Sequence, residues 1–145
     1  MDKYNLQRFL DAQNQDDMYL NALNEIKCGK KVSHWIWYVF PQHVALGRSP
    51  MNIRYGITSS KEAKAYIEND ILRERLLTIC EALYEIKGRD LVSIVGEIDA
   101  LKIRSCCTLF DAVAPEYTIF KMIIKKYCRS LPCYRTLGLL EREEE

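Results

Sequence analysis

The longest periodic stretch of the chain is DILRERLLTICEALYEIKG, residues 70–88. Its apolar residues recur every three or four positions, the spacing that gives a helix one apolar face. They are Ile71, Leu72, Leu76, Ile79, Leu83 and Ile86. Asp70 is a suitable cap for the first turn, and Gly88 stops the pattern. The stretch therefore predicts a long helix and favours a helical fold around it.

Helical spacing continues on both sides of this stretch. Leu6, Phe9 and Leu10 predict a short first helix. Further helices are expected near 15–28, from Ser59 to Glu68, over about 97–113 and from Pro115 to about Tyr127. Ser59 and Glu62 match a capping box, whose hydroxyl and carboxylate accept the free N–H groups of the first turn. The acidic tail, 141–145, is expected to fray.

Few alternating runs are long enough to be strands, and no internal repeat or linker divides the chain. We therefore predict one compact all-α domain over residues 1–145, a multi-helical globule of about six or seven helices. At 145 residues, such a domain buries enough surface to fold without a disulfide or a metal.

The charges of the chain nearly cancel, with 21 basic and 20 acidic side chains. This balance argues against a protein that coats nucleic acid or binds an anionic membrane surface. The apolar run from Trp35 to Pro41 is much shorter than the roughly 18 to 20 residues that span a bilayer. The charged segment Met1–Arg8 does not look like a secretory leader, so we expect a cytoplasmic protein.

The six cysteines do not form a metal-binding pattern. No CxxC pair occurs, only two histidines are present, and the adjacent Cys106 and Cys107 point in different directions on a helix. We expect no metal and no cofactor. In a reducing compartment, most of these thiols should act as small buried apolar groups.

Aromatic residues concentrate in SHWIWYVFPQH, residues 33–43, which includes both tryptophans and both histidines. The segment suits one or two helical turns that end at the proline. It is either a core helix or an aromatic wall, formed by Trp35 and Trp37, that stacks a flat ring. In the second case His34 and Gln42 would lie at its rim.

The next segment, 45–56, lacks clear periodicity and is expected to be a loop. Arg48 and Arg54 could bind phosphate or carboxylate, with Ser49 and Tyr55 beside them. The glycine pattern matches neither a Walker loop nor a dinucleotide fingerprint. The alternative is a surface connection with solvated arginines.

Polar residues interrupt the apolar pattern of the helix expected near 97–113. Lys102 lies within the apolar arc, so its ammonium group must reach solvent, pair with a carboxylate or meet an anionic ligand. Asp99, three residues earlier, could be that partner. Ser105 and Thr108 form a polar seam that suits close helix packing or hydroxyl contacts to a ligand, and Arg104 lies beside them.

Several of these motifs resemble the domain of unknown function 1810 family. The similar stretches are 33–42, 46–49, 54–57, 62–66 and 99–110, and the resemblance runs from about Leu6 to Leu140. It implies a compact all-α bacterial fold but no reaction. Cys106 and Cys107 stand where the family usually has Ser-Met, and Gly56 stands where it commonly has Ala. Some relatives carry a calpastatin-like label, but calpastatins are disordered and this composition is that of a packed globule.

The chain is also similar to the NADAR superfamily, small helical proteins linked to NAD and ADP-ribose chemistry. This resemblance implies that the aromatic wall stacks an adenine-like or nicotinamide-like ring. Arg48 and Arg54 would then bind phosphates, and Lys102 and Asp99 would act near a ribose. In hydrolysis of an N-glycosidic bond, Asp99 would be the carboxylate that stabilises the sugar or activates water.

The leading hypothesis is a site for a small anionic, nucleotide-like molecule, built where these three segments converge. Lys102, Asp99 and His34 are its candidate catalytic residues. The candidate ligand-binding residues are Trp35, Trp37, Gln42, Arg48, Ser49, Arg54, Tyr55, Arg104, Ser105 and Thr108.

Two alternatives belong to other functional classes. The first is a binding or regulatory module that recognises its ligand without chemistry. The second is an interaction domain in which the motif residues are core, with both tryptophans packed, Lys102 paired internally and no cavity. The sequence leaves the oligomeric state open.

Overall fold

Ten α-helices and two short 3₁₀ turns make up residues 1–143, the part of the chain that the computed structural model describes. The helices are α1 (Gln7–Asn14), α2 (Met18–Lys27), α3 (Ile36–Val39), α4 (Pro50–Tyr55), α5 (Ser60–Glu68), α6 (Asp70–Glu85), α7 (Leu91–Val95), α8 (Glu97–Val113), α9 (Ile119–Tyr127) and α10 (Tyr134–Arg142). Within these residues the only strand-like pairing is one isolated bridge between His43 and Ile57. The all-α prediction is confirmed.

Seven of the helices have eight residues or more, namely α1, α2, α5, α6, α8, α9 and α10. Their number agrees with the sequence-based prediction, but three helices were not expected. α4 and α7 are short, and α10 (Tyr134–Arg142) lies mostly before the tail 141–145 that was expected to fray, in residues for which no helix was predicted. Residues 144 and 145 of that tail lie outside the described residues.

Two predicted helix starts are wrong by a few residues. Asn69, not Asp70, caps α6, because its Oδ1 accepts from the N–H groups of Ile71 and Leu72. Asp70 instead forms an exposed ion pair with Arg73 at 2.8 Å. Pro115 lies before a turn, and α9 begins only at Ile119.

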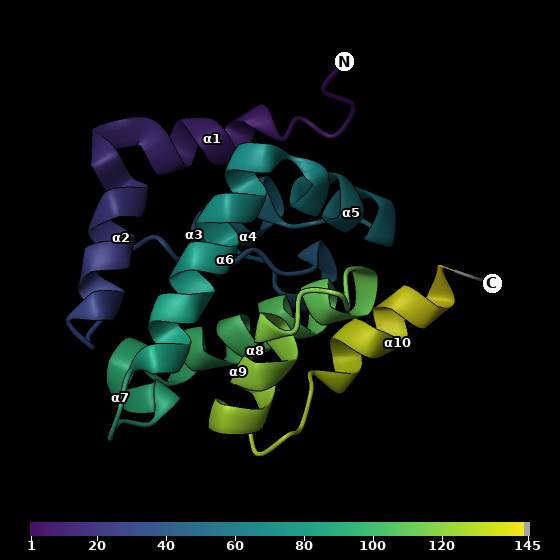
Figure 1. The fold of residues 1–145 in the computed structure, drawn as a ribbon. Helices are drawn as coiled ribbons and strands as arrows, with labels where there is room; N and C mark the ends of the chain where they lie inside the picture. Colours follow the sequence, from purple (N-terminus) through teal and green to yellow (C-terminus); the bar gives the residue numbers. More distant parts are fainter. Residues whose placement is uncertain (144–145) are drawn as a thin grey trace.

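The two longest helices, α6 and α8, organise the packing. α8 packs against α5, α7, α9 and α10, whereas α6 packs against α2, α5 and α9. Figure 1 shows α1 at one end of the molecule and α9 and α10 at the other. Gly96 adopts φ +90°, a conformation that L side chains rarely reach, which lets α8 follow α7 at a sharp turn.

Aromatic rings fill the core that these helices enclose. Trp35, Phe9, Phe40, Tyr66, Phe110 and Phe120 are all fully buried. Tyr66 links two groups of rings, because its centroid lies 5.0 Å from that of Phe9 and 5.3 Å from that of Phe110. Large buried rings dominate the apolar surface that a core removes from water. The main role of the segment 33–40 is therefore to supply core residues.

All six cysteines carry free thiols, and they occupy three kinds of environment. Cys80, Cys106 and Cys107 are buried, as small apolar side chains commonly are. Burial raises the pKa of Cys106 well above its usual range. Cys28 is exposed, and Cys128 and Cys133 are half-buried, so the prediction of buried thiols holds for only three of them.

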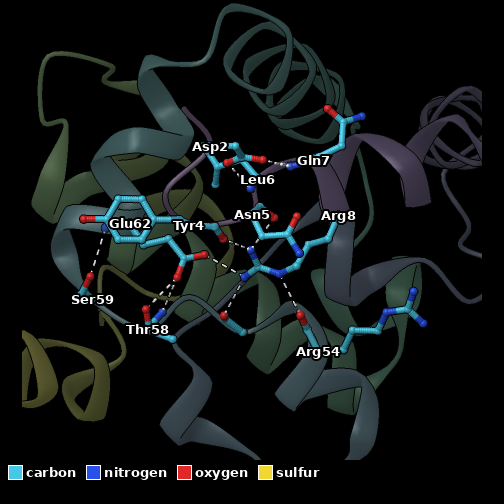
Figure 2. Close-up of polar contacts among 11 residues, drawn as sticks. Asp2, Tyr4, Asn5, Leu6, Gln7, Arg8, Arg54, Thr58, Ser59 and Glu62 are labelled. Atoms are coloured by element: carbon cyan, nitrogen blue, oxygen red, sulfur yellow. Dashed lines mark hydrogen bonds and ion pairs between the residues drawn. The ribbon is translucent and has the colours of Figure 1, made fainter.

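An ion pair ties the N-terminal segment to α5 (Figure 2). Arg8 donates to Glu62 at 2.7 Å and also to the backbone carbonyls of Tyr4, Asn5, Arg54 and Gly56. Glu62 accepts two further bonds from Thr58, so both charged groups are well satisfied although Glu62 is buried and Arg8 is half-buried. The Ser59 hydroxyl accepts from the Glu62 N–H, which confirms that half of the predicted capping box.

Over residues 1–143, none of the helices is long and apolar enough to cross a membrane. In the same residues no three histidine, cysteine, aspartate or glutamate side chains come together as possible metal ligands.

Candidate functional site

A surface cavity of about 410 Å³ lies between the exposed face of α8 and the start of α10. The segment between α3 and α4 closes it from a third side, because Gln42 and Leu46 reach its wall. The other lining residues are Ile98, Leu101, Lys102, Arg104, Ser105, Pro132, Cys133, Tyr134 and Arg135. We call this cavity the α8–α10 pocket.

The charged residues of the α8–α10 pocket are all basic. Its lining contains Lys102, Arg104 and Arg135 and, among the described residues, no aspartate, glutamate or histidine. Basic side chains around a partly enclosed space concentrate anions, because the low-dielectric walls focus their field. The pocket therefore suits a negatively charged molecule.

Arg104 also builds the wall of the pocket. Its Nε donates to the Leu131 carbonyl at 2.8 Å and its Nη2 donates to the Pro132 carbonyl at 3.0 Å. These bonds hold the segment that leads into α10 against α8. Arg104 is thus partly committed to structure, which leaves its remaining N–H groups for a ligand.

Lys102 shares the carboxylate of Asp99 with a second lysine. The distance from Lys102 Nζ to Asp99 Oδ1 is 3.4 Å, and that from Lys31 Nζ to Asp99 Oδ2 is 2.9 Å. Lys102 also lies over the ring of Trp37, 4.8 Å from its centroid, and Lys31 lies over Trp35 at 5.0 Å. The predicted Asp99–Lys102 pair is therefore present, although Asp99 itself does not line the pocket.

Exposed apolar side chains surround the basic groups. Ile98, Leu101 and Tyr134 line the pocket, and their exposed fractions are 70%, 58% and 65%. Large apolar groups that gather at a concave surface are typical of binding sites. The pocket thus combines apolar surface for a ring or chain with cations for a negative group.

Hydroxyl groups of α8 lie next to Cys133, the residue immediately before α10. Thr108 Oγ1 accepts from the Cys133 N–H at 2.9 Å and donates to the Arg104 carbonyl at 2.8 Å. Ser105 Oγ donates to the Leu101 carbonyl at 2.9 Å and lines the pocket next to Cys133. The polar seam predicted on α8 therefore serves close packing at Thr108 and reaches the pocket at Ser105.

Four of the predicted site residues line the α8–α10 pocket: Gln42, Lys102, Arg104 and Ser105. Asn52 holds the side chain of Gln42 in place, because Gln42 Nε2 donates to Asn52 Oδ1 at 3.0 Å. The aromatic segment and the Lys102 helix thus meet at this pocket, and they are two of the three segments that the leading hypothesis expected to converge.

The predicted aromatic wall is not available to a ligand as a whole. Trp35 is fully buried, and its Nε1 donates to Glu25 at 2.9 Å. Trp37 is half-buried beneath Lys102, and Tyr55 is buried. Trp37, Gln42, Tyr55 and Lys102 surround a narrow gap that leaves no room for a small molecule. Trp35 and Tyr55 therefore belong to the core.

The segment 45–56 is not the open loop that the sequence predicted. Ser49 caps α4, accepting from the Asn52 N–H at 3.2 Å, so its hydroxyl stabilises a helix. Arg48 and Arg54 are exposed and do not line the α8–α10 pocket. The Arg54 carbonyl contacts Arg8, whereas its side chain points away from that cluster (Figure 2).

The remaining predicted residues also lie outside the pocket. His34 is exposed on the surface, and its carbonyl accepts from the Tyr38 hydroxyl at 3.4 Å. Thr108 is buried behind Cys133. His43, the last residue of the aromatic segment 33–43, is buried, and its Nδ1 accepts from the Ala45 N–H. Burial lowers the pKa of His43 below its ordinary value, which favours the neutral ring.

The sequence analysis missed the contribution of α10. Cys133, Tyr134 and Arg135 come from the first turn of that helix, which a proline precedes. The available signal was the spacing of Leu137 and Leu140 after Pro132, which is that of a short amphipathic helix.

Comparison with known proteins identifies relatives of unknown function. A family model described as "Protein of unknown function (DUF1810)" matches residues 3–140. The crystal structure of the conserved hypothetical protein Rv1873 from Mycobacterium tuberculosis is 37% identical in sequence, with a TM-score of 0.92, and the match covers 95% of this chain and 97% of that one. None of the curated proteins matches the chain.

Proposed function

Since the chain belongs to the DUF1810 family, whose function is unknown, we propose its function from its own surface: the α8–α10 pocket binds a small anionic, nucleotide-like molecule. The observation that carries this proposal is the lining itself. Lys102, Arg104 and Arg135 line one cavity whose described lining has no acidic side chain, and Asp99, which pairs with Lys102, lies outside that lining. A balanced chain, with a formal net charge of +1, thus has a local excess of positive charge at one concave site.

The apolar part of the pocket supports a ligand that also carries a ring. Tyr134 is 65% exposed and lies beside Arg135, the next residue of α10. An exposed tyrosine offers a flat face for stacking, and an arginine suits phosphate because its N–H groups can donate two bonds at once. A nucleotide-like molecule would place its base near Tyr134 and its phosphate near Arg135 and Lys102.

We propose that the pocket binds its ligand and does not hydrolyse an N-glycosidic bond. That reaction would need a carboxylate near the sugar, and Asp99 was the candidate. Its two oxygens are engaged by Lys31 and Lys102, and it lies outside the pocket lining. We assign Lys102 the role of an anion-binding group held in place by Asp99. All six cysteines are free thiols, which fits a reducing compartment such as the cytoplasm. We propose that the protein binds its ligand there.

Isothermal titration calorimetry with AMP, ADP-ribose, NAD and ribose 5-phosphate tests the proposal. We expect at least one of these anions to bind the reduced wild type, with adenosine, which lacks the phosphate, binding more weakly. Arg135→Gln should weaken binding by about tenfold, the loss of roughly 1.4 kcal/mol of binding free energy.

Arg48→Gln is the matched control, because it removes one exposed arginine charge outside the pocket. We expect this variant to bind like the wild type. If Arg48→Gln weakens binding and Arg135→Gln does not, the ligand binds elsewhere. If none of the four anions binds at millimolar concentration, the proposed function is wrong.

A further inference from the structure

We propose that Cys133 is the nucleophile of the α8–α10 pocket and that it exchanges with small anionic disulfides to form a mixed disulfide. The inference rests on the proposed anion pocket and adds to it a reactive group. It is carried by three observations: the place of the cysteine in the cavity, a buried hydroxyl without a partner three residues later, and the basic side chains around the cavity.

Cys133 is the residue immediately before α10, and its side chain lines the pocket. It is half-buried, so a small molecule in the cavity can reach the sulfur. Arg104 and Arg135 line the same cavity. Reactive cysteines occupy this kind of place, partly accessible and electropositive at the start of a helix.

The hydroxyl of Thr136 is an independent sign of a polar site. Thr136 is 0% exposed, and within residues 1–143 its Oγ1 has no hydrogen-bond partner. A buried hydroxyl without such a partner is costly, so few are found in folded proteins. This one belongs to the residue three positions after Cys133, where it would stabilise the negative charge of a thiolate and so lowers the pKa of that thiol.

The environment of Cys133 favours the charged form of the thiol. Burial by itself raises the pKa of Cys133, but the hydroxyls of Ser105 and Thr136 and the N–H groups of Arg135 and Thr136 outweigh it and lower the pKa below the ordinary value. The half-buried Cys128 differs, because its burial raises its pKa to about 11. At neutral pH, Cys133 is therefore the more nucleophilic of these two half-buried thiols.

The chemistry of the lining points to a disulfide as the electrophile. In the exchange, Cys133 Sγ bonds to one sulfur of the disulfide while the S–S bond of the reagent breaks. The other half leaves as a thiolate and takes its proton from water, so Cys133 is oxidised and the released thiol is reduced. A thiolate leaves without a general acid. This suits a pocket whose described lining holds no carboxylate or imidazole.

The basic lining selects the charge of the reagent. Lys102 and Arg135 should attract a disulfide that carries carboxylates and should repel one that carries amines. Cys28 is the internal reference, because it is exposed and lies at the end of α2, away from the pocket lining. We therefore expect Cys133 to react faster with anionic disulfides than with cationic ones, and we expect Cys28 to show this preference more weakly.

The test incubates the protein with glutathione disulfide, which is anionic, or with cystamine, which is cationic, and measures modification of each cysteine by peptide mass spectrometry. With glutathione disulfide we expect Cys133 to react at least about tenfold faster than Cys28, and with cystamine we expect this advantage to disappear. Arg135→Gln should lower the rate at Cys133 severalfold and leave Cys28 unchanged. Saturation with a nucleotide that binds should protect Cys133 only.

Two results would overturn the inference. If Cys133 reacts no faster than Cys28 while the reduced wild type still binds nucleotides in the calorimeter, only the reactive role of Cys133 is wrong. If Cys133 reacts equally with both disulfides and no nucleotide binds, the anion pocket is wrong as well. Melting temperatures of the wild type and Arg135→Gln identify any loss of reactivity that comes from unfolding.

Discussion

Arg8 Nη2 lies 2.7 Å from Glu62 Oε2, and this contact joins residues that are 54 positions apart in the chain. The exposed fractions of the two side chains are only 14% and 2%. The ion pair therefore replaces water for both groups, and it fixes the N-terminal segment on α5.

Replacing Arg8 by methionine should destabilise the fold strongly, because it leaves the Glu62 carboxylate buried without its cation. We expect the free energy of unfolding to fall by about 3–5 kcal/mol. Urea denaturation at neutral pH measures this change. Asp70→Asn is the control, since it removes a carboxylate from an exposed ion pair and should cost less than about 1 kcal/mol. Equal effects of the two substitutions would show that the buried pair contributes no more than an exposed one.

Glu25 should make the stability depend on pH in the acid range. Burial alone would raise its pKa, but the N–H groups of Ser33 and Val32 and the indole N–H of Trp35 lower the pKa of Glu25 to about 2. Because the folded pKa is depressed, the stabilisation is complete above the ordinary glutamate value of 4.5. It is lost as the pH falls toward about 2.

The Glu25→Gln variant tests this pH dependence. We expect the wild type to be more stable than the variant at pH 6, and we expect the difference to shrink steadily between pH 4.5 and pH 2. Urea denaturation at several pH values measures it. A difference that stays constant across this range would mean that Glu25 titrates alike in the folded and unfolded chains.

Lys31 and Lys102 form a natural pair of test sites, because each contacts Asp99 and lies over a tryptophan ring. Lys31→Met and Lys102→Met should each lower the free energy of unfolding by about 1 kcal/mol, since Asp99 keeps the other lysine. Only Lys102 lines the α8–α10 pocket, so only Lys102→Met should weaken the binding of an anionic ligand. Thermal unfolding and calorimetry separate the two effects, and equal loss of binding in both variants would contradict the assignment.

Gly56 should not tolerate alanine. A Cβ at this position would lie 2.5 Å from Val44 Cβ and 2.6 Å from both Val44 Cα and the Asn52 carbonyl oxygen. Two of these atoms belong to the backbone, so the segment around Val44 would have to move. We expect Gly56→Ala to cost about 1–3 kcal/mol in a urea titration. Val44→Gly, which removes the Val44 Cβ, should not rescue it because the two backbone contacts remain, and a full rescue would show that only the Val44 side chain is in the way.

The sequence by itself determined those features that depend on neighbours along the chain. Apolar spacing predicted α8 over about 97–113, and the helix spans Glu97–Val113. The pairing of Asp99 with Lys102 could be predicted in the same way, because side chains three residues apart lie on one side of a helix. The helical backbone and the neighbours of a side chain along one helix are set within one or two turns. A periodic pattern of apolar residues therefore contains most of the information needed to predict them.

The burial of each of the two tryptophans could not be predicted in this way. Trp35 and Trp37 lie two residues apart, yet Trp35 is fully buried and Trp37 is half-buried beneath a lysine of α8. Their difference comes from the helices that pack on either side of the segment 33–40. Aromatic composition alone therefore predicted a site where the structure has mostly core.

Only the tertiary structure decided where the candidate site lies. Arg104 reaches the carbonyl of Leu131, 27 residues later, and this contact places Cys133 and Arg135 opposite Lys102. Four of the predicted residues line this pocket because they lie on α8 or just before α4, whereas the first turn of α10 was missing from the prediction. A contact between distant segments depends on how the whole core packs, and no local spacing encodes it.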